Sequence, residues 1–353
     1  MNGIAVAPVK EHTRMKAVVY HRYGPPDVLR LQEVETPVIT DDQVLIGVQA
    51  ASVNPADWHL MRAQPFTARF EMGLRKPKHT ILGVDVAGRV AAVGGNVTRF
   101  QPGDEVFGVT FQSGWGGFAE YVALAEDRVA LKPANLTFEE AAAVPLAALT
   151  ALQGLRDKGR IQAGQRVLIN GASGGVGTFA VQLAKAFGAE VTGVCSARNL
   201  DMARSIGAEH VIDYTREDFT ATGQTHDLIY CAVGNRAARE YRRALSPGGV
   251  CVVAGFTTMP HLLLRTALPG ALLSMTGSRK VGFMGTVKPN GADLTRIADL
   301  IEAGAVTPVI DRRYPLSETA EAIRYLEGGH ARGKVVIVVR EQGSDAGEPC
   351  ASR

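Results

Sequence analysis

One segment constrains the fold of this chain more than any other: an apolar strand that runs straight into a glycine-rich turn and then a helix. The strand is Arg166–Asn170, the turn is Gly171-Ala-Ser-Gly-Gly-Val-Gly177, and a helix is expected over 178–187. Glycines permit the tight turn and a close backbone approach, while the helix start offers amide groups and the positive end of its dipole. The segment therefore predicts a binding site for the diphosphate of a dinucleotide. The alternative is a purely structural strand–helix turn.

The end of the next strand, 190–195, bears on which dinucleotide is bound. An acidic residue there would hydrogen-bond the ribose 2′-hydroxyl of NAD, whereas arginine and hydroxyl groups suit the 2′-phosphate of NADP. This chain has Ser196 and Arg198, and its first acid is Asp201, which we interpret as the N-cap of the following helix. Tyr214, after a third strand, could add a hydroxyl or a stacking face. These residues favour NADPH, although Arg198 could instead be a solvated loop residue and Tyr214 a rim aromatic.

The region that contains the glycine turn alternates between strands and helices. This alternation predicts a doubly wound parallel sheet, an α/β fold with its cofactor at the carboxyl ends of the strands. Ser246-Pro-Gly-Gly249 is expected to end a helix and form a turn. The expected strands are 166–170, 190–195, 210–213, 227–231 and 249–254, and the expected helices are 178–187, 199–206 and 235–245.

The remainder of the chain has a different pattern on each side of that region. From Met15 to about Leu136, short β-branched runs alternate with turn signals, which predicts a barrel-like or sandwich domain. A helix is expected over 138–157, with Thr137 and Glu140 forming a capping box. After an irregular, flexible-looking segment over 257–279, strands are expected at 280–284, 307–310 and 334–339, and helices at 292–303 and 317–326. This apolar C-terminal part is expected to return to the β-rich domain.

Composition indicates a globular chain rather than a membrane or nucleic-acid-binding protein. The 353 residues are 46% hydrophobic, the formal net charge is only +3, and the longest apolar run, 262–275, is interrupted by Arg265 and Pro269. Residues 1–14 and 341–353 are expected to be flexible tails. Of the four cysteines, Cys195, Cys231 and Cys251 lie in strand-like runs where a free thiol packs as a small apolar group, and Cys350 lies in the tail. A reducing cytoplasm fits this cysteine usage best.

Several motifs, in this order along the chain, resemble one enzyme family: the medium-chain dehydrogenase/reductases, in their zinc-free, quinone-oxidoreductase-like branch. The resemblance spans about 15–340. It depends most on three motifs, and other matching segments are 117–122, 149–154, 207–214 and 332–337. The three motifs are Leu82-Gly-Val-Asp-Val-Ala-Gly88, Pro102-Gly-Asp-Glu-Val-Phe-Gly108 and the Gly171–Gly177 turn.

The resemblance implies a domain arrangement and a homodimer. A GroES-like β-rich domain would comprise 15–136, completed by 287–340, with a Rossmann domain over 137–286 inserted between them.

The chain departs from the zinc-dependent members of the family at their metal ligands. Where those members have a cysteine and a histidine–acid pair, this chain has Asn54 and Val84-Asp85. Tetrahedral zinc needs thiolate or imidazole ligands, so we expect no metal.

The resemblance also implies which residues contact the cofactor. Asn54 would lie beside the nicotinamide and its ribose, Thr150 near the same ring, and Phe283 at the rim of the cleft. Asn54 and Asp57 are the candidates for a catalytic role, although Asn54 also suits a turn before Pro55 and Asp57 a helix cap. The other cofactor-binding residues are expected to be Ser173, Gly174, Gly175, Val176, Ser196, Arg198, Tyr214, His330 and Arg332.

Without a Lewis acid to stabilise an alkoxide, reduction of a conjugated C=C bond or a quinone is easier than alcohol oxidation, because the negative charge is delocalised. The leading hypothesis is therefore an NADPH-dependent reductase of a small electrophile: an enone, an enal or a quinone. One alternative is a metal-free reductase of aldehydes or ketones. The other is a non-catalytic NADPH-binding sensor or interaction protein.

Overall fold

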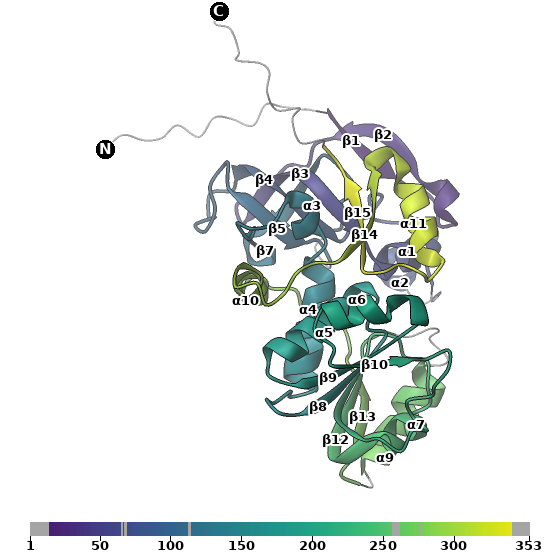
Figure 1. The fold of residues 1–353 in the computed structure, drawn as a ribbon. Helices are drawn as coiled ribbons and strands as arrows, with labels where there is room; N and C mark the ends of the chain where they lie inside the picture. The colour runs from purple at the N-terminus through teal and green to yellow at the C-terminus, as the bar shows by residue number, and fades with distance from the viewer. Residues whose placement is uncertain are drawn as a thin grey trace, which may run out of the picture.

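The computed structural model of the chain describes residues 14–340 except 65, 67, 68, 112, 113, 256–261 and 276. Figure 1 shows two units, a β-rich unit that contains both ends of the described chain and an α/β unit below it. The predicted tail segments 1–13 and 341–353, and with them Cys350, lie outside the described residues. Arg14 does not belong to a tail, since it begins the first strand.

The α/β unit contains a six-stranded parallel sheet in the order β10-β9-β8-β11-β12-β13, which confirms the doubly wound fold. Its central strands are apolar and almost entirely buried because helices cover both faces of such a sheet. The strands are β8 (Arg166–Asn170), β9 (Glu190–Cys195), β10 (His210–Asp213), β11 (His226–Cys231), β12 (Leu245–Val253) and β13 (Lys280–Phe283). The helices are α5 (Gly175–Ala186), α6 (Leu200–Ser205), α7 (Ala238–Arg243) and α9 (Leu268–Met275).

The β-rich unit contains a seven-stranded sheet that the C-terminal part of the chain completes, as predicted. Strand β15 pairs antiparallel with β3, with Val335 opposite Val53 and Val338 opposite Ala50. A separate two-stranded sheet joins β1 and β2. The strands are β1 (Arg14–Val19), β2 (Arg30–Glu35), β3 (Gln43–Val53), β4 (Asp85–Val93), β5 (Glu105–Val109), β6 (Tyr121–Ala125), β7 (Val129–Leu131), β14 (Ile310–Pro315) and β15 (Lys334–Val338). The helices of this part are α1 (Pro55–Arg62), α2 (Arg69–Met72), α10 (Gly291–Glu302) and α11 (Thr319–Glu327).

The helix expected over 138–157 is divided into three pieces. Thr137 and Glu140 form the predicted capping box at the start of α3 (Phe138–Ala142). Pro145, which has no backbone N–H to continue α3, begins α4 (Pro145–Gln153), and a π-helical turn follows over Gly154–Lys158.

Four further expectations were wrong in detail. Residues 262–275 are helical rather than irregular, with a π-helical stretch (Leu262–Ala267) leading into α9. Ser246 to Gly249 belong to β12, where a register shift opposite β11 accommodates them. Asn199, not Asp201, is the N-cap of α6. The strand expected at 307–310 begins only at Ile310.

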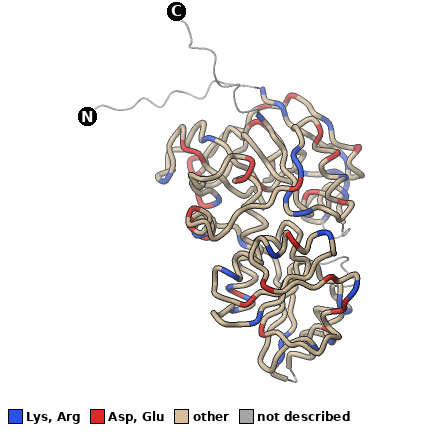
Figure 2. Tube along the Cα trace, viewed as in Figure 1, with Lys and Arg blue, Asp and Glu red and all other residues tan. Residues whose placement is uncertain are grey.

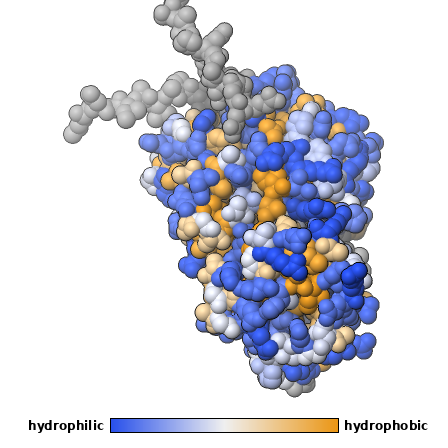
Figure 3. All heavy atoms as spheres, in the orientation of Figure 1, coloured by the Kyte–Doolittle hydropathy of each residue, from blue (hydrophilic) through white to orange (hydrophobic). Residues whose placement is uncertain are grey.

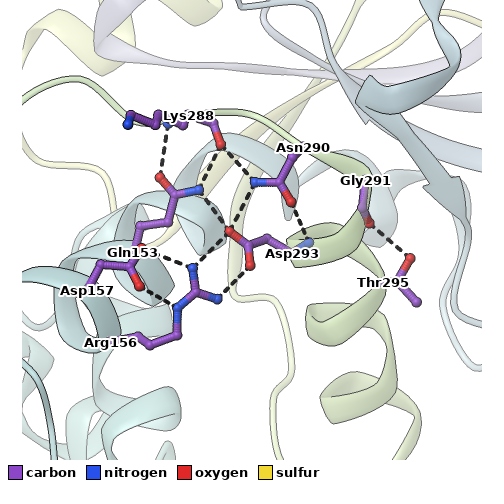
Figure 4. Close-up of polar contacts among 8 residues, drawn as sticks. All are labelled: Gln153, Arg156, Asp157, Lys288, Asn290, Gly291, Asp293 and Thr295. Carbon is purple, nitrogen blue, oxygen red and sulfur yellow. Dashed lines mark hydrogen bonds and ion pairs between the residues drawn. The ribbon is translucent and has the colours of Figure 1, made fainter.

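A polar cluster fastens the chain where it leaves the α/β unit and returns to the β-rich unit (Figure 4). The side-chain amide of Gln153 donates to the carbonyl of Lys288 at 2.8 Å and accepts from the backbone N of Lys288 at 2.9 Å. Asp293 on α10 pairs with Arg156 at 2.5 Å and accepts a hydrogen bond from Gln153 at 2.9 Å. The returning segment therefore has a fixed path beside α4.

One apolar core extends across both units. It includes Phe107 and Val336 from the β-rich sheet, Leu149 from α4, and Phe179 and Val191 from the parallel-sheet unit. Because close-packed cores resist displacement, the two units meet at a defined junction. The candidate site lies at this junction.

Candidate active site

The glycine turn holds backbone amides open at the start of α5. The helix begins at Gly175, and its N-cap, Gly174, makes no side-chain capping hydrogen bond. A Cβ atom on Gly174 would meet only the carbonyl oxygen of Gly171, at 3.7 Å, whereas one on Gly177 would lie 1.9 Å from that oxygen. The turn thus packs tightly at Gly177 and stays accessible at Gly174, as a diphosphate cradle requires.

Asn199 offers a further polar group beside this cradle. Its Nδ2 donates to Ser173 Oγ at 3.1 Å and to Ser196 Oγ at 3.2 Å. Its Oδ1 is buried and has no hydrogen-bond partner among the described residues. A buried acceptor without a partner is costly, and a ribose hydroxyl of a bound dinucleotide would satisfy it. The residues present therefore fit a dinucleotide. Asn199 was missed because the sequence interpretation placed the helix cap at Asp201 and assigned Asn199 no role.

The residues expected at the 2′-phosphate come together at the end of β9. Ser196 and Arg198 follow that strand directly, and the backbone N of Tyr214 donates to the carbonyl of Cys195 at 3.1 Å. Arg198 is exposed and its guanidinium donates to the carbonyl of His330 at 3.3 Å, while Tyr214 is 56% exposed. This edge offers a guanidinium and hydroxyl groups to an anion.

A network of buried polar side chains lies on the β-rich side of the junction, with Asp85 at its centre. Asp85 Oδ2 accepts from Ser52 Oγ at 2.7 Å, Asn54 Nδ2 at 2.9 Å and Lys334 Nζ at 3.1 Å. Its Oδ1 accepts from the backbone N of Leu146 in the first turn of α4, at 2.8 Å. Asp85 is fully buried and Lys334 is 3% exposed. This ion pair thus joins β4, β15 and the start of α4.

Lys334 also connects this network to the cradle. The backbone N of Gly333 donates to the carbonyl of Ser173 at 2.8 Å, and Gly174 and Gly333 form a bridge. A Cβ on Gly175 would lie 2.9 Å from Lys334 Cδ, so the lysine stem runs along the start of α5. Sequence reasoning missed Lys334, although this residue lies in the segment 332–337 that resembles the family. A lysine that opens the apolar run Lys334-Val-Val-Ile-Val-Val339 was the signal that could have found it.

Asp57, the second catalytic candidate, is fully buried in the first turn of α1, three residues after Asn54. Its Oδ2 accepts from the backbone N of Asn54 at 2.8 Å, and its Oδ1 accepts from the backbone N of Gly83 at 2.9 Å. Burial raises the pKa of Asp57 to about 7. In the structure, Asp57 therefore fastens α1 to the segment before β4, and its role as a proton relay stays a prediction.

The remaining predicted residues differ in how close they lie to these groups. The Thr150 hydroxyl donates to the carbonyl of Leu146 at 2.6 Å, which places Thr150 one helical turn beyond the Asp85 contact on α4. Val176 lies in the first turn of α5. Arg332, exposed, precedes Gly333, and its backbone N donates to Asp311 at 2.9 Å. Phe283, 38% exposed, ends β13, the last strand of the parallel sheet. Contact of these residues with a cofactor stays a prediction.

The donor groups of this junction do not resemble a zinc site. Val84 is apolar, Asn54 offers an amide oxygen, and Asp85 already accepts four hydrogen bonds, one from the Lys334 ammonium. Within the described part of the chain, no group of three or more His, Cys, Asp or Glu side chains could hold a metal ion. The Lys334 ammonium thus pairs with the Asp85 carboxylate, the group that would otherwise be a candidate metal ligand.

A separate cavity of about 310 Å³ opens on the β-rich unit. Its lining contains no residue of the cradle or of the Asp85 network. Lys78, His79, Trp115 and Tyr121 are among the residues that line it.

Two family models match the chain. The model described as "Alcohol dehydrogenase GroES-like domain" matches residues 40–134, and the model described as "Zinc-binding dehydrogenase" matches residues 206–337. The second description mentions zinc, whereas Asn54, Val84 and Asp85 do not offer the thiolate and imidazole ligands that tetrahedral zinc needs.

Curated relatives and solved structures are similar to almost the whole chain. A 2-methylene-furan-3-one reductase of Solanum lycopersicum is 39% identical over 336 residues, 92% of this chain and 79% of the relative. An NADPH-dependent alkenal/one oxidoreductase, chloroplastic, of Arabidopsis thaliana is 36% identical with the same coverage. The structure of the quinone oxidoreductase from Coxiella burnetii superposes with a TM-score of 0.82 at 32% identity, over 93% of this chain and 100% of that one.

Proposed function

The chain belongs to the medium-chain dehydrogenase/reductase superfamily, in its quinone-oxidoreductase-like branch, and we propose on this premise that it is an NADPH-dependent reductase of activated C=C bonds or quinones. Its substrates would be small enones, enals or quinones. The observation that carries the proposal is the direct connection, through Gly333 and Lys334, of the open diphosphate cradle to a buried network whose carboxylate is held by an ammonium.

The chemistry fits a site without zinc. Bound NADPH supplies a hydride to the electrophilic carbon. The negative charge that forms on a conjugated carbonyl or a quinone is delocalised, so hydrogen-bond donors or water suffice where simple alcohol chemistry uses a metal. The protein would hold the nicotinamide and the substrate close together in the orientation that hydride transfer needs, and would exclude water.

The chain's residues divide this work by position. Gly174, Gly175, Val176 and Ser173 hold the diphosphate, and Asn199 accepts from a ribose hydroxyl. Ser196, Arg198 and Tyr214 hold the 2′-phosphate, with His330 and Arg332 closing over the adenosine end. Asn54 and Thr150 lie toward the nicotinamide, and Phe283 lies at the rim.

An assay of substrate panels tests this function. Purified protein with NADPH should reduce enals, enones or naphthoquinones above the blank rate, and product analysis of the enones should show a saturated C–C bond with the carbonyl intact. Products in which only the carbonyl is reduced would instead support a metal-free aldehyde or ketone reductase. Tight NADPH binding without turnover of any electrophile would support the non-catalytic sensor. Added zinc and added chelator should both leave the rate unchanged.

Arg198 should decide the choice between the two nicotinamide cofactors. The Arg198 guanidinium would donate a charge-assisted hydrogen bond to the 2′-phosphate of NADPH. Arg198→Ala should therefore weaken NADPH binding by about 10- to 100-fold. NADH affinity should stay unchanged, because NADH has a hydroxyl in place of the 2′-phosphate. Isothermal titration of both cofactors measures this. Arg204, which pairs with Asp201 on the exposed side of α6, provides the matched control. Equal losses for NADPH and NADH would contradict the assignment.

We further propose that the protein is a homodimer. Strand β13 is the end strand of the parallel sheet, and α9, which packs against it, exposes Leu268, Leu272 and Met275 by 58%, 67% and 82%. An open strand edge beside an apolar helix face favours pairing with a second copy. Figure 3 shows apolar surface on both units. The double variant Leu268→Glu/Leu272→Glu should shift the mass measured by light scattering from dimer to monomer, and a wild-type protein that is already monomeric would sink the proposal.

Two observations bear on partners and surroundings. Lys and Arg alternate with Asp and Glu along both units (Figure 2), which disfavours a nucleic-acid surface. Among the described residues, no helix has the length and apolar character needed to cross a bilayer. The three buried free cysteines fit the proposed cytoplasmic location.

A further inference from the structure

The buried amide of Asn54 lies between two groups of opposite charge, and this fixes what the amide can bind. Lys334 Nζ lies 2.7 Å from Asn54 Oδ1, and Asp85 Oδ2 lies 2.9 Å from Asn54 Nδ2. An ammonium group has only donors and a carboxylate has only acceptors. The amide oxygen must therefore face Lys334 and the amide nitrogen must face Asp85, since the reverse orientation would lose both hydrogen bonds.

This orientation leaves no free donor on Asn54. The second N–H of Nδ2 donates to the carbonyl of Ser52 at 3.3 Å. The amide oxygen has two lone pairs, and Lys334 uses one of them. Asn54 can therefore accept one more hydrogen bond but cannot donate one, so it cannot hold the carbonyl oxygen of a substrate.

The two charged residues are also well placed to hold this orientation. Asp85 accepts from the first turn of α4, and Lys334 follows Gly333, which pairs with the cradle at Ser173. The pair therefore spans the helix that carries Thr150 and the turn that would hold the diphosphate. Neither side chain is free to turn away, since Asp85 is fully buried and Lys334 is 3% exposed.

We propose that Lys334 and Asp85 are positioning residues that present the oxygen of Asn54 to a hydroxyl of the nicotinamide-side ribose. This inference depends on the proposed function only in that the ligand is NADPH. The acceptor holds the ribose, and the carbonyl of the substrate must find its donors elsewhere.

Calorimetric binding of two ligands, without turnover, tests this arrangement. The probes are NADPH and an NADPH analogue in which hydrogens replace both hydroxyls of the nicotinamide-side ribose. Wild-type protein should bind the analogue about 10-fold more weakly, as expected for the loss of one buried hydrogen bond. In Lys334→Met/Asp85→Asn neither charge orients the amide, so this ratio should fall to about 1. Asn54→Leu should give the same ratio of about 1.

A second pair of variants separates positioning from stability. Lys334→Met alone leaves the buried Asp85 charge unpaired but still able to hold Asn54 Nδ2. It should therefore unfold at a lower temperature than Lys334→Met/Asp85→Asn and yet keep a ratio near 10. Lys132 is the control: it is a lysine of 6% side-chain exposure that pairs with Glu105 at 3.2 Å, outside the site. Lys132→Met should lower the unfolding temperature and keep the ratio near 10.

A ratio near 10 in folded Lys334→Met/Asp85→Asn, or near 1 in the wild-type protein, would overturn the inference. Wild-type protein that binds NADPH with the expected ratio but reduces no electrophile would support the inference and overturn the proposed function. If the wild-type protein does not bind NADPH, both are overturned.

Discussion

Replacement of Gly177 by alanine should lower the free energy of unfolding by about 3 kcal/mol or more and abolish NADPH binding. The new Cβ would lie 1.9 Å from the carbonyl oxygen of Gly171 and 2.8 Å from its carbon. Such an overlap with backbone cannot be relieved by a rotamer change, so either the turn or the start of α5 must move. Because the same backbone forms the cradle, stability and binding should be lost together. Chemical denaturation and calorimetry measure the two effects.

Gly174→Ala is the matched control within the same turn. Gly174 has a φ of −84°, which alanine adopts freely, and its new Cβ would lie 3.7 Å from its nearest neighbour. The unfolding free energy should stay within about 0.5 kcal/mol of the wild-type value. The added methyl would nevertheless stand where the diphosphate approaches, so NADPH affinity should fall about 10-fold or more. If Gly174→Ala binds NADPH normally, the cradle does not lie at this turn.

The fold was largely predictable because its strongest signals are local. Strands 166–170 and 190–195 were predicted at the bounds that the structure shows, since each is an apolar run closed by glycine or polar residues. The errors fell where tertiary contacts override local pattern. Residues 262–275 look irregular because they are apolar on several sides, whereas the structure shows a helix that packs on β13 with part of its apolar surface exposed.

The candidate site was less predictable because its central contacts join distant segments. Lys334 and Asn54 are 280 positions apart, and Lys334 and Asp85 are 249 apart. The motif around Asp85 was recognised as a family motif that lacks a histidine, but Asp85 was given no role, since sequence gives no partner for a single carboxylate. By contrast, Ser173 to Gly177 are neighbours in sequence and share one turn, so their arrangement could be predicted directly.

The unfolding free energy should fall by about 2 to 4 kcal/mol between pH 4.5 and pH 7 because of Asp57 alone. Its pKa is about 7 in the folded protein and 3.8 as a model group. In this window the folded protein binds the proton and the unfolded chain does not, so rising pH favours unfolding. Each unit of pKa difference corresponds to about 1.4 kcal/mol. The stabilisation that comes from the proton on Asp57 is therefore complete below pH 4 and is lost as the pH rises through 7.

Other groups titrate in or near the same range, so the effect must be read as a difference between two proteins. Burial lowers the pKa values of His59 and His226, which makes stability rise with pH over part of this window. Asp57→Asn keeps the size of the side chain and has no titrating proton, while those histidines are unchanged. The stability of the wild-type protein minus that of Asp57→Asn should therefore decrease from pH 4.5 to pH 7, as measured by urea unfolding at each pH. A difference that stays constant or increases would show that Asp57 is ionised throughout, held so by the two backbone N–H groups of Asn54 and Gly83.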